Sequence, residues 1–491
     1  MSKNLLNSRS QSGHVAAGLR MSTLAVAVLV ITAGCDGLLD VDLPGDMTDT
    51  DLLQPDQASL MVDAAIAAFE CDFSTYSATI TGMEDATWVA GGYWGSIPNY
   101  ATERVSLTAA GVSGTIYCSN RPDFAQNWYM DFQGSHLLAR MAYEQLSEAW
   151  TEADVPNRER LMATAATYIG LYYVTLGEIF CEFSPNSGPL LSPREMMAQA
   201  EGWFTTALNH VANTGDFSIV STESILQLAL LGRARARLNM EDHQGASADA
   251  AEIQPGFVAW VTRDSSVRSR WNTVYHGLNQ MQWRSFQPAL VWSHTGEVVS
   301  AGYKYLTISE DGRQTISDGM PDPRVPVEYV GGVGIDPSID QYNQFKYTGL
   351  GADQRLGSWA EAQLILAEIE GGQSAVDRIN ALRDIHGLPH FSSTDEDEIY
   401  SAMIEERRRE FFLEGKHFAD KLRLGLWFPR GRGENWRGEA FGYALCWLMP
   451  ISEYENNENI AAGYEGPDLT DPNYVFDLRV DRIADWPVYF N

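Results

Sequence analysis

Two groups of aromatic residues are the strongest candidates for contact with a ligand. Four of the fourteen tryptophans fall within 33 residues, where an even spread would place about one: Trp260, Trp271, Trp283 and Trp292. A second group, interleaved with glycines and Asn99, comprises Trp88, Tyr93, Trp94 and Tyr100. Flat aromatic rings stack on the apolar C–H faces of sugar rings, while Asn, Asp and Arg side chains bond the hydroxyls.

We therefore predict a ligand-binding site built from eight residues: Trp88, Tyr93, Trp94, Asn99, Tyr100, Trp271, Tyr275 and Trp283. Core packing is the alternative for each single tryptophan, since tryptophan is heavily buried on average. Trp359, Trp427 and Trp447 lie elsewhere in the chain, and we assign them to the core.

Motifs of known catalytic chemistry are missing from the sequence. It contains no Gly-x-Ser-x-Gly elbow, no phosphate-binding glycine-rich loop and no His-Glu-x-x-His pair. His386 and His390 are four residues apart, but Gly387 and Pro389 between them prevent a shared helix face, so we predict no metal site there. Paired carboxylates of a glycoside hydrolase stay open as an alternative, because 65 acidic residues guarantee chance pairs. We predict a protein that is not an enzyme and needs no cofactor.

The first 35 residues predict export and acylation. Residues 1–34 carry three basic residues and no acidic one, and the apolar run from Leu24 to Ile31 is too short to cross a bilayer. Small residues follow, up to Cys35. This pattern is typical of a secretory signal peptide, and its end resembles a bacterial lipobox, at which the signal is cut before an acylated cysteine. We therefore predict palmitate-type lipid attachment at Cys35, with an acidic tether over 35–55 that holds the body near a lipid bilayer.

Composition restricts the function further. The chain has 491 residues, 45% apolar residues and a formal charge of −31, which becomes −34 once residues 1–34 are removed. Such a charge excludes a nucleic-acid binder, because phosphate contacts need a basic face. An exported chain can form one or two disulfides, and four cysteines allow three full pairings among Cys71, Cys118, Cys181 and Cys446.

Helical periodicity dominates two blocks of the chain, about 128–252 and about 356–427. In the first, Met196, Ala200, Phe204, Leu208 and Val211 fall on one helix face. Small residues recur in this block, which lets helices approach closely, and pairs of such helices joined by short loops favour tetratricopeptide-like stacking. Residues 71–127 and 253–355 lack this period, and we predict them to be irregular insertions that carry the ligand site. The predicted fold is mainly α, a scaffold of helical pairs with large irregular loops and few short strands, in a single domain over 56–491.

Five ordered motifs resemble the SusD/RagB family of outer-membrane nutrient-binding lipoproteins. They are Cys35 with Leu38-Leu39-Asp40, Asp322-Pro323-Arg324, Ser358-Trp359-Ala360-Glu361 with Ile379-Asn380 and Arg383, Glu406-Arg407 with Glu410-Phe411, Glu414-Gly415, Asp420 and Arg423, and Met449-Pro450-Ile451 with Asn456 and Asn457. The resemblance runs from Cys35 to about Asn459. For the charged run we predict a structural role in which Glu and Arg pair along the helix face or tie it to a neighbour.

The resemblance implies a function that no single residue shows. It implies a lipoprotein of the cell outer membrane, facing outward, that binds a glycan or peptide nutrient in the irregular segments. It also implies a SusC-like TonB-dependent transporter as the partner that receives the ligand. A surface glycoside hydrolase and a helical-repeat envelope scaffold without a small ligand remain the alternatives.

Overall fold

The structure, a computed structural model, describes residues 53–84, 87–89, 128–282, 284–286, 291–292, 298–299, 307–315, 319–334, 337, 340–426, 445–471 and 473–480. The chain divides into two units, Met1–Leu52 and Leu53–Asn491. The first unit, with the predicted signal, Cys35 and most of the tether, lies outside the described residues.

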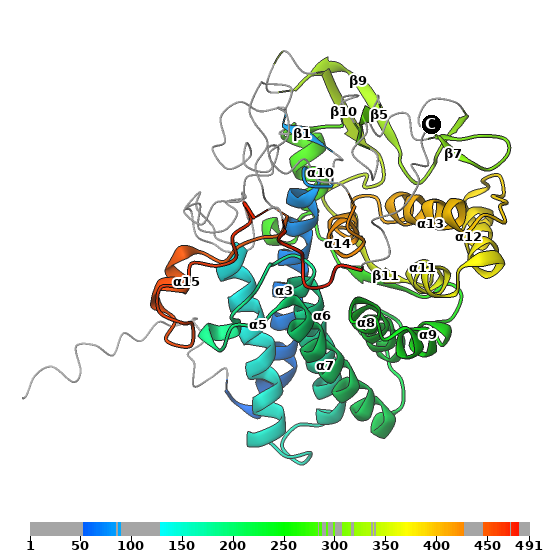
Figure 1. Ribbon diagram of the computed structural model, residues 1–491. Coiled ribbons are helices and arrows are strands. Elements are labelled where there is room, and N and C mark those ends of the chain that lie inside the picture. The colour runs from blue at the N-terminus through cyan, green and yellow to red at the C-terminus, as the bar shows by residue number, and fades with distance from the viewer. Residues whose placement is uncertain are drawn as a thin grey trace, which may run out of the picture. The chain divides into compact units, whose positions relative to one another are not determined.

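Helices make up most of the described chain, which confirms the predicted mainly α class (Figure 1). The α-helices are α3 (Ala58–Ile80), α5 (Trp128–Glu144), α6 (Arg158–Gly177), α7 (Pro193–Thr214), α8 (Ile225–Asn239), α9 (His243–Ala251), α10 (Thr273–Tyr275), α11 (Trp359–Glu370), α12 (Gly372–His386), α13 (Glu396–Glu410), α14 (His417–Arg423) and α15 (Ile451–Asn456). Short 3₁₀ or π turns are η1 (Pro55–Gln57), η3 (Gln145–Ala149), η4 (Pro185–Ser187), η5 (Arg268–Arg270) and η6 (His276–Gln280).

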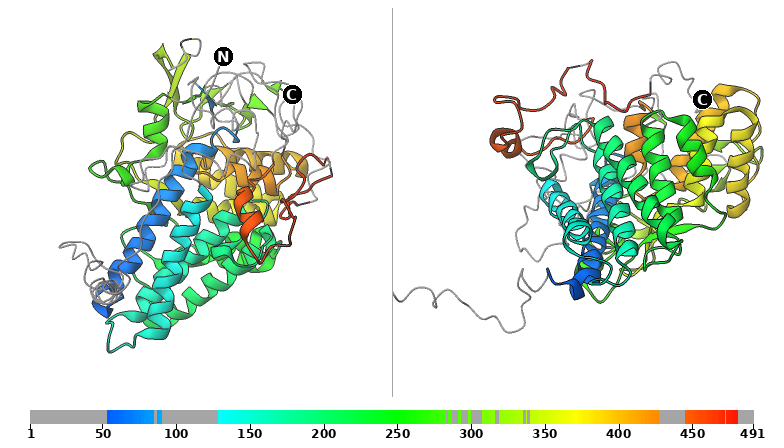
Figure 2. Two further views of the ribbon diagram at one scale, coloured as in Figure 1. Left: turned by 90° about the vertical axis from the view of Figure 1, so that its left-hand side faces the viewer. Right: turned by 90° about the horizontal axis from the view of Figure 1, so that it is seen from below.

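Consecutive helices pack on one another, as the predicted helical pairs require. Helix α3 lies beside α5 and α6, and α6, α7, α8 and α9 follow in order (Figure 2). The ring of Phe204 on α7 fills the space left by two glycines, Gly170 on α6 and Gly232 on α8. A Cβ atom at Gly170 would lie 2.8 Å from that ring, so the small residues noted in the sequence do allow close helix approach.

Local signals explain where these helices begin and end. Ser192 caps α7 with a capping box, in which its hydroxyl accepts from the Glu195 N–H at 3.3 Å and the Glu195 carboxylate accepts from the Ser192 N–H at 2.8 Å. Helix α12 ends at Gly387, whose φ of +64° places it in the left-handed region that favours glycine.

The predicted start of the first irregular insertion, at residue 71, is wrong. Helix α3 continues to Ile80, because residues 71–77 are all buried against the other helices and their side-chain hydroxyls bond the carbonyls four residues back. Ser and Thr at these positions weaken the apolar pattern by which a sequence reveals a helix. The irregular part of this insertion therefore begins after residue 80.

The second insertion consists of short strands and turns, and its two ends pair with each other. Its described strands are β2 (Val258–Val261), β3 (Arg284–Ser285), β4 (Val291–Trp292), β5 (Val298–Val299), β6 (Thr307–Ile308), β7 (Gln314–Thr315), β8 (Met320–Pro321), β9 (Val327–Val333), β10 (Asp340–Gln344) and β11 (Gln354–Ser358). Strand β1 (Trp88–Val89) belongs to the first insertion. Strand β2 pairs antiparallel with β11, with Gln354 opposite Val261 and Ser358 opposite Val258. The insertion thus leaves the helical scaffold and returns to it at one place.

A disulfide joins Cys181, just after α6, to Cys446. The backbone around it pairs as well, since the Cys181 N–H donates to the Trp447 carbonyl at 2.8 Å and the Trp447 N–H donates to the Ile179 carbonyl at 2.9 Å. Cys71 is also disulfide-bonded, and Cys118 lies outside the described residues. Among the alternatives left open by the sequence, the structure selects a pairing that contains Cys181–Cys446.

Candidate functional site

A short antiparallel pairing joins the two aromatic segments of the sequence. Strand β1, which contains Trp88, pairs with β3, so that Trp88 lies opposite Ser285 and Val89 opposite Arg284. Strand β3 follows Trp283 directly and also lies against β10. Residues almost 200 positions apart in the chain are therefore neighbours, because Trp88 and Val89 pair with Ser285 and Arg284.

Trp271 is held in a defined orientation at the surface of the second insertion. It follows the turn η5 and is half-buried, and its indole Nε1–H donates to the Ser265 carbonyl at 2.9 Å. The His276 ring lies 5.1 Å from the Trp271 ring, centre to centre, and the guanidinium carbon of Arg268 lies 6.0 Å from the same ring centre. An aromatic ring with a fixed edge and a partly exposed face is suited to stacking.

Asn272 and the following helix anchor this aromatic to the scaffold. The Asn272 side chain caps α10 by accepting from the Tyr275 N–H at 2.8 Å, and it donates to the Ala352 carbonyl at 2.7 Å. The Thr273 N–H donates to the hydroxyl of Ser74 on α3 at 3.1 Å. The long helix α3 and the segment before β11 together position the loop that carries Trp271.

Of the other predicted ligand residues, the structure describes the side chain of Tyr275 and the backbone of Trp88. Tyr275 is half-buried and packs against an apolar cluster with Val274, Leu278 and Phe286, so part of its surface is structural. Trp88 is described by its backbone alone, in β1. The rest lie outside the described residues, namely Tyr93, Trp94, Asn99, Tyr100 and Trp283. The sequence-based prediction missed Arg268 and His276, although Arg268 stands three residues before Trp271, a spacing that a single 3₁₀ turn brings together.

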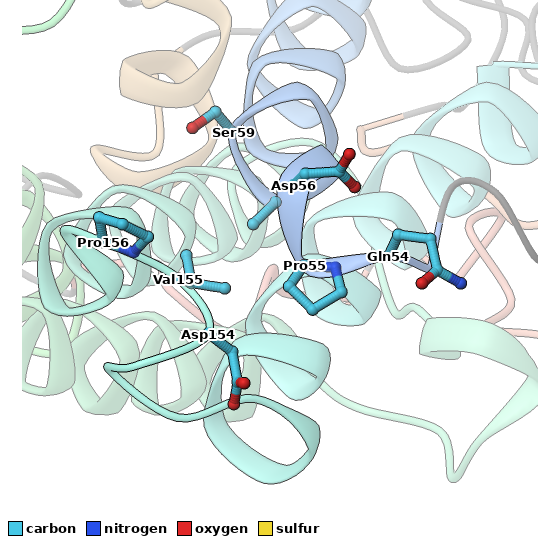
Figure 3. Close-up of a pocket in the computed structure, with 8 residues that line it drawn as sticks. Gln54, Pro55, Asp56, Ser59, Asp154, Val155 and Pro156 are labelled. Carbon is cyan, nitrogen blue, oxygen red and sulfur yellow. The ribbon is translucent and has the colours of Figure 1, made fainter.

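One cavity in the described part of the chain lies away from these aromatic residues. A cavity of about 670 Å³ opens at the start of α3, where Pro55, Asp56 and Ser59 face the loop residues Asp154–Pro156 (Figure 3). Among the described residues that line it, none has an aromatic or cationic side chain and none is a predicted ligand residue. Its chemistry therefore does not suit the stacking of a sugar ring.

The charged run on α13 is buried, contrary to the common solvated face of such runs. Glu406 is fully buried and accepts from Arg383 on α12 at 2.7 Å, from Gln314 on β7 at 2.8 Å and from Arg324. Burial alone would raise the pKa of Glu406, but the charges of Arg324 and Arg383 outweigh it and the pKa is lowered. The structural role is as predicted, but most partners come from other elements instead of from α13 itself.

This buried network ties the second insertion to the helices. Arg324 binds Asp322 with two side-chain bonds, at 3.0 and 2.8 Å, and Arg355 of β11 bonds Glu410 and Glu414 at 2.8 Å each. Asp322 also lies 3.3 Å from Arg409. Burial raises the pKa of Asp322, but the bonds and charge of Arg324 outweigh it and lower that pKa to about 2. The Asp-Pro-Arg motif thus holds the second insertion against α13 through buried ion pairs, which is a structural role.

Glu84, between α3 and β1, gives a pH-dependent prediction. Its carboxylate accepts from the backbone N–H of His417 at 3.0 Å and of Phe418 at 3.3 Å, and burial raises its pKa from 4.5 to about 7. A raised carboxyl pKa means that this group stabilises the fold most below pH 4.5 and that its contribution is lost as pH rises through 7. As the pH rises from 4.5 to 8, we expect the free energy of unfolding of Glu84→Gln to increase by up to about 3 kcal/mol relative to that of the wild type.

Urea unfolding at both pH values measures this difference. Glu370→Gln, which alters an exposed ion pair with Arg378, is the control and should show a nearly constant difference. A Glu84→Gln difference that does not change with pH would contradict the assignment.

His386 and His390 make separate contacts in the structure. His386 bonds Glu410 at 3.0 Å and His390 bonds Asp384 at 2.6 Å, so the two rings contact different carboxylates. Among the described residues, no group of three or more His, Cys, Asp or Glu side chains is arranged to hold a metal ion. In the same part of the chain, no helix combines the length and apolar character needed to cross a bilayer.

Comparison with solved structures places this arrangement among known folds. A SusD superfamily protein from Parabacteroides distasonis is 13% identical, with a TM-score of 0.59 over 83% of this chain and 99% of that one. NanU from Bacteroides fragilis is 13% identical, with a TM-score of 0.53 over 87% and 100%. Surface glycan-binding protein A from Bacteroides thetaiotaomicron is 11% identical, with a TM-score of 0.50 over 82% and 97%. No protein-family model and no curated protein sequence matches the chain.

Proposed function

The chain has the SusD-like fold that its five ordered motifs predict, and on this basis we propose that it is a surface-exposed outer-membrane lipoprotein that binds a glycan. In this proposal Cys35 carries the lipid, and the aromatic segments grip the ligand. A SusC-like TonB-dependent transporter receives the ligand from it. The chain itself makes and breaks no bond.

The observation that carries the proposal is the convergence of the aromatic segments on a SusD-like scaffold. The β1–β3 pairing brings Trp88 next to the strand that follows Trp283, and Trp271 lies between η5 and α10 in the same insertion as β3. One protein with a similar fold is named a surface glycan-binding protein, which supports a glycan as the ligand. Stacking on several rings binds an oligomer without chemical change, and release to a partner then needs only the loss of those contacts.

A tryptophan substitution tests ligand binding. Trp271→Ala should weaken binding to the preferred glycan by about 1–3 kcal/mol, which is roughly 5- to 150-fold in Kd, if Trp271 is a central contact. The matched control is Trp260→Ala, since Trp260 is 40% exposed on β2 and is not among the predicted ligand residues. Titration calorimetry against a panel of polysaccharide oligomers gives the affinities.

Three outcomes would contradict the proposal. Equal affinities for both variants and the wild type would remove Trp271 from the site. Shortened oligomers after incubation would show a hydrolase, and no binding across the panel would favour an envelope scaffold.

For the anchor and the partner, Cys35→Ala should release the protein from membranes, and mild-detergent purification of the wild type should bring down an outer-membrane barrel.

A further inference from the structure

The antiparallel pair of β9 and β10 has a buried base and an exposed apolar end. At the base, Val327 is buried in an apolar cluster that also contains Phe286. Beyond Val327 every residue of β9 is exposed, and Tyr329 and Val333 expose 49% and 45% of their surfaces. Neighbouring exposed apolar side chains of this size mark a surface that contacts a ligand or a partner.

The ring of Tyr329 is held on one side and exposed on the other. Tyr329 lies opposite Tyr342 of β10, so the two side chains share one face of the pair. Their ring centres are 5.3 Å apart, and Tyr342 is buried, so it supports the Tyr329 ring from the side of the core. Among the residues that the structure describes, none bonds the Tyr329 hydroxyl. A supported aromatic ring with an exposed face is a surface on which a sugar ring can stack.

The backbone that follows Tyr329 leaves room for a ligand. The register of the pair shifts between Asp340 and Tyr342, which indicates a β-bulge. Gly331 in this part of β9 has a φ of +77°, a conformation that favours glycine. A Cβ atom at Gly331 or Gly332 would meet no atom of the described residues within 4 Å. Glycine inside a strand often marks a close approach of a ligand, and here it lies directly beside an exposed ring.

Hydrogen bonds connect this pair to the strand that contains Trp88. The Ser285 hydroxyl of β3 donates to the Asp340 carbonyl at 2.7 Å and accepts from the Tyr342 N–H at 3.0 Å. Strand β3 in turn pairs with β1, which contains Trp88. The strands therefore follow in the order β1, β3, β10 and β9, at one end of the molecule (Figure 1). Three spacings of about 4.8 Å place β9 on the order of 15 Å from β1.

We propose that the exposed end of the β9–β10 pair is a second stacking platform of the glycan site, with Tyr329 as its contact, and that the ligand is a linear oligosaccharide that extends from β1 to β9. The inference rests on the proposed glycan-binding function and specifies its ligand class. A single sugar ring covers one aromatic side chain, so contacts on both strands need a chain of several units. The net charge of −31 favours a neutral chain, because it repels polyanions.

The test measures affinity as a function of ligand length. The probes are neutral linear oligosaccharides of the malto, xylo, manno and laminari series, from the disaccharide to the octasaccharide, titrated by calorimetry. We expect the wild type to bind the long members of at least one series more tightly than the short ones. Tyr329→Ala should weaken binding of those long members about tenfold. The shortest member that binds should keep its affinity within about twofold, because it does not reach β9.

Two further variants of β9 separate the ring from the fold. Tyr329→Phe keeps the ring and should bind the long oligosaccharides within about threefold of the wild type. Val330→Ala removes a similarly exposed apolar side chain next to Tyr329. Because neighbouring residues of a strand point to opposite faces, Val330→Ala should leave every affinity unchanged. Circular dichroism and thermal melting confirm that each variant is folded.

The outcomes distinguish this inference from the proposed function. Equal affinities for all lengths, or a Tyr329→Ala effect that is absent or the same at every length, overturns the second platform. If oligosaccharides bind in that case and Trp271→Ala weakens their binding, the proposed glycan-binding function stands. If no oligosaccharide binds, both are overturned. A Tyr329→Ala variant with wild-type affinities that no longer purifies with an outer-membrane barrel would assign the β9–β10 pair to the partner and overturn the platform.

Discussion

Replacing Glu406 with alanine should destabilise the folded chain by about 3–5 kcal/mol, as expected when one partner of a buried charge pair is removed. The Glu406 carboxylate accepts hydrogen bonds from Arg383, Arg324 and Gln314, which come from three different segments of the chain. The Arg383 side chain is fully buried. Without the carboxylate, two arginines remain buried close to each other with less compensation. Urea unfolding followed by circular dichroism measures the change in the free energy of unfolding.

A surface pair provides the matched control. Glu370→Ala removes the exposed partner of Arg378, 2.7 Å away, and should cost less than about 1 kcal/mol because solvent screens the pair. Glu406→Gln keeps a hydrogen-bond acceptor, so its loss in the free energy of unfolding should lie between those of Glu406→Ala and Glu370→Ala. A Glu406→Ala effect no larger than that of Glu370→Ala would show that the network is dispensable.

Removing the disulfide by the double substitution Cys181→Ala with Cys446→Ala should cost about 2–5 kcal/mol of stability. The bond closes a sequence separation of 265 residues, and a cross-link over a long loop restricts the unfolded chain strongly. In the folded state it holds the segment around Trp447, whose indole donates to the sulfur of Met83 at 3.2 Å. Thermal and urea unfolding under oxidising conditions give the measurement.

Reduction separates this bond from the one at Cys71. Wild type treated with a reducing agent should lose at least as much stability as the double variant, because Cys71 is disulfide-bonded as well. Reduction should lower the stability of the double variant by less than it lowers the stability of the wild type. A double variant as stable as oxidised wild type would mean that backbone pairing alone holds the segment.

Helix positions could be read from the sequence because their signals are local. The face that runs from Met196 to Val211 matches α7, and Gly387, a residue type that commonly follows a helix, comes directly after the last residue of α12. The first insertion was placed ten residues too early, because Ser74, Thr75 and Ser77 hide the end of α3 from an apolar pattern. Their burial depends on helices that are distant in sequence, which no local pattern reports.

The charged helix shows the same division. Its Glu and Arg spacing allows pairing along α13, and the i,i+4 pair of Glu405 with Arg409 at 3.7 Å does occur. Its main partners, however, come from three other segments: Asp322 and Arg324 between β8 and β9, Arg355 on β11 and Arg383 on α12. Spacing within one helix carries no information about charges contributed from elsewhere.

For this protein the sequence alone determined the mainly α class and the scaffold of helical pairs, since both follow from the helical period of apolar residues and from the residues that end helices. Only the tertiary structure decided that β1 pairs with β3, that Arg268 stands beside Trp271 and that Cys181 bonds Cys446. These are contacts between surfaces that come together when the chain folds, and their free energy depends on what each side chain meets there. Composition indicates which interactions a segment can make, whereas the fold determines which residues it contacts.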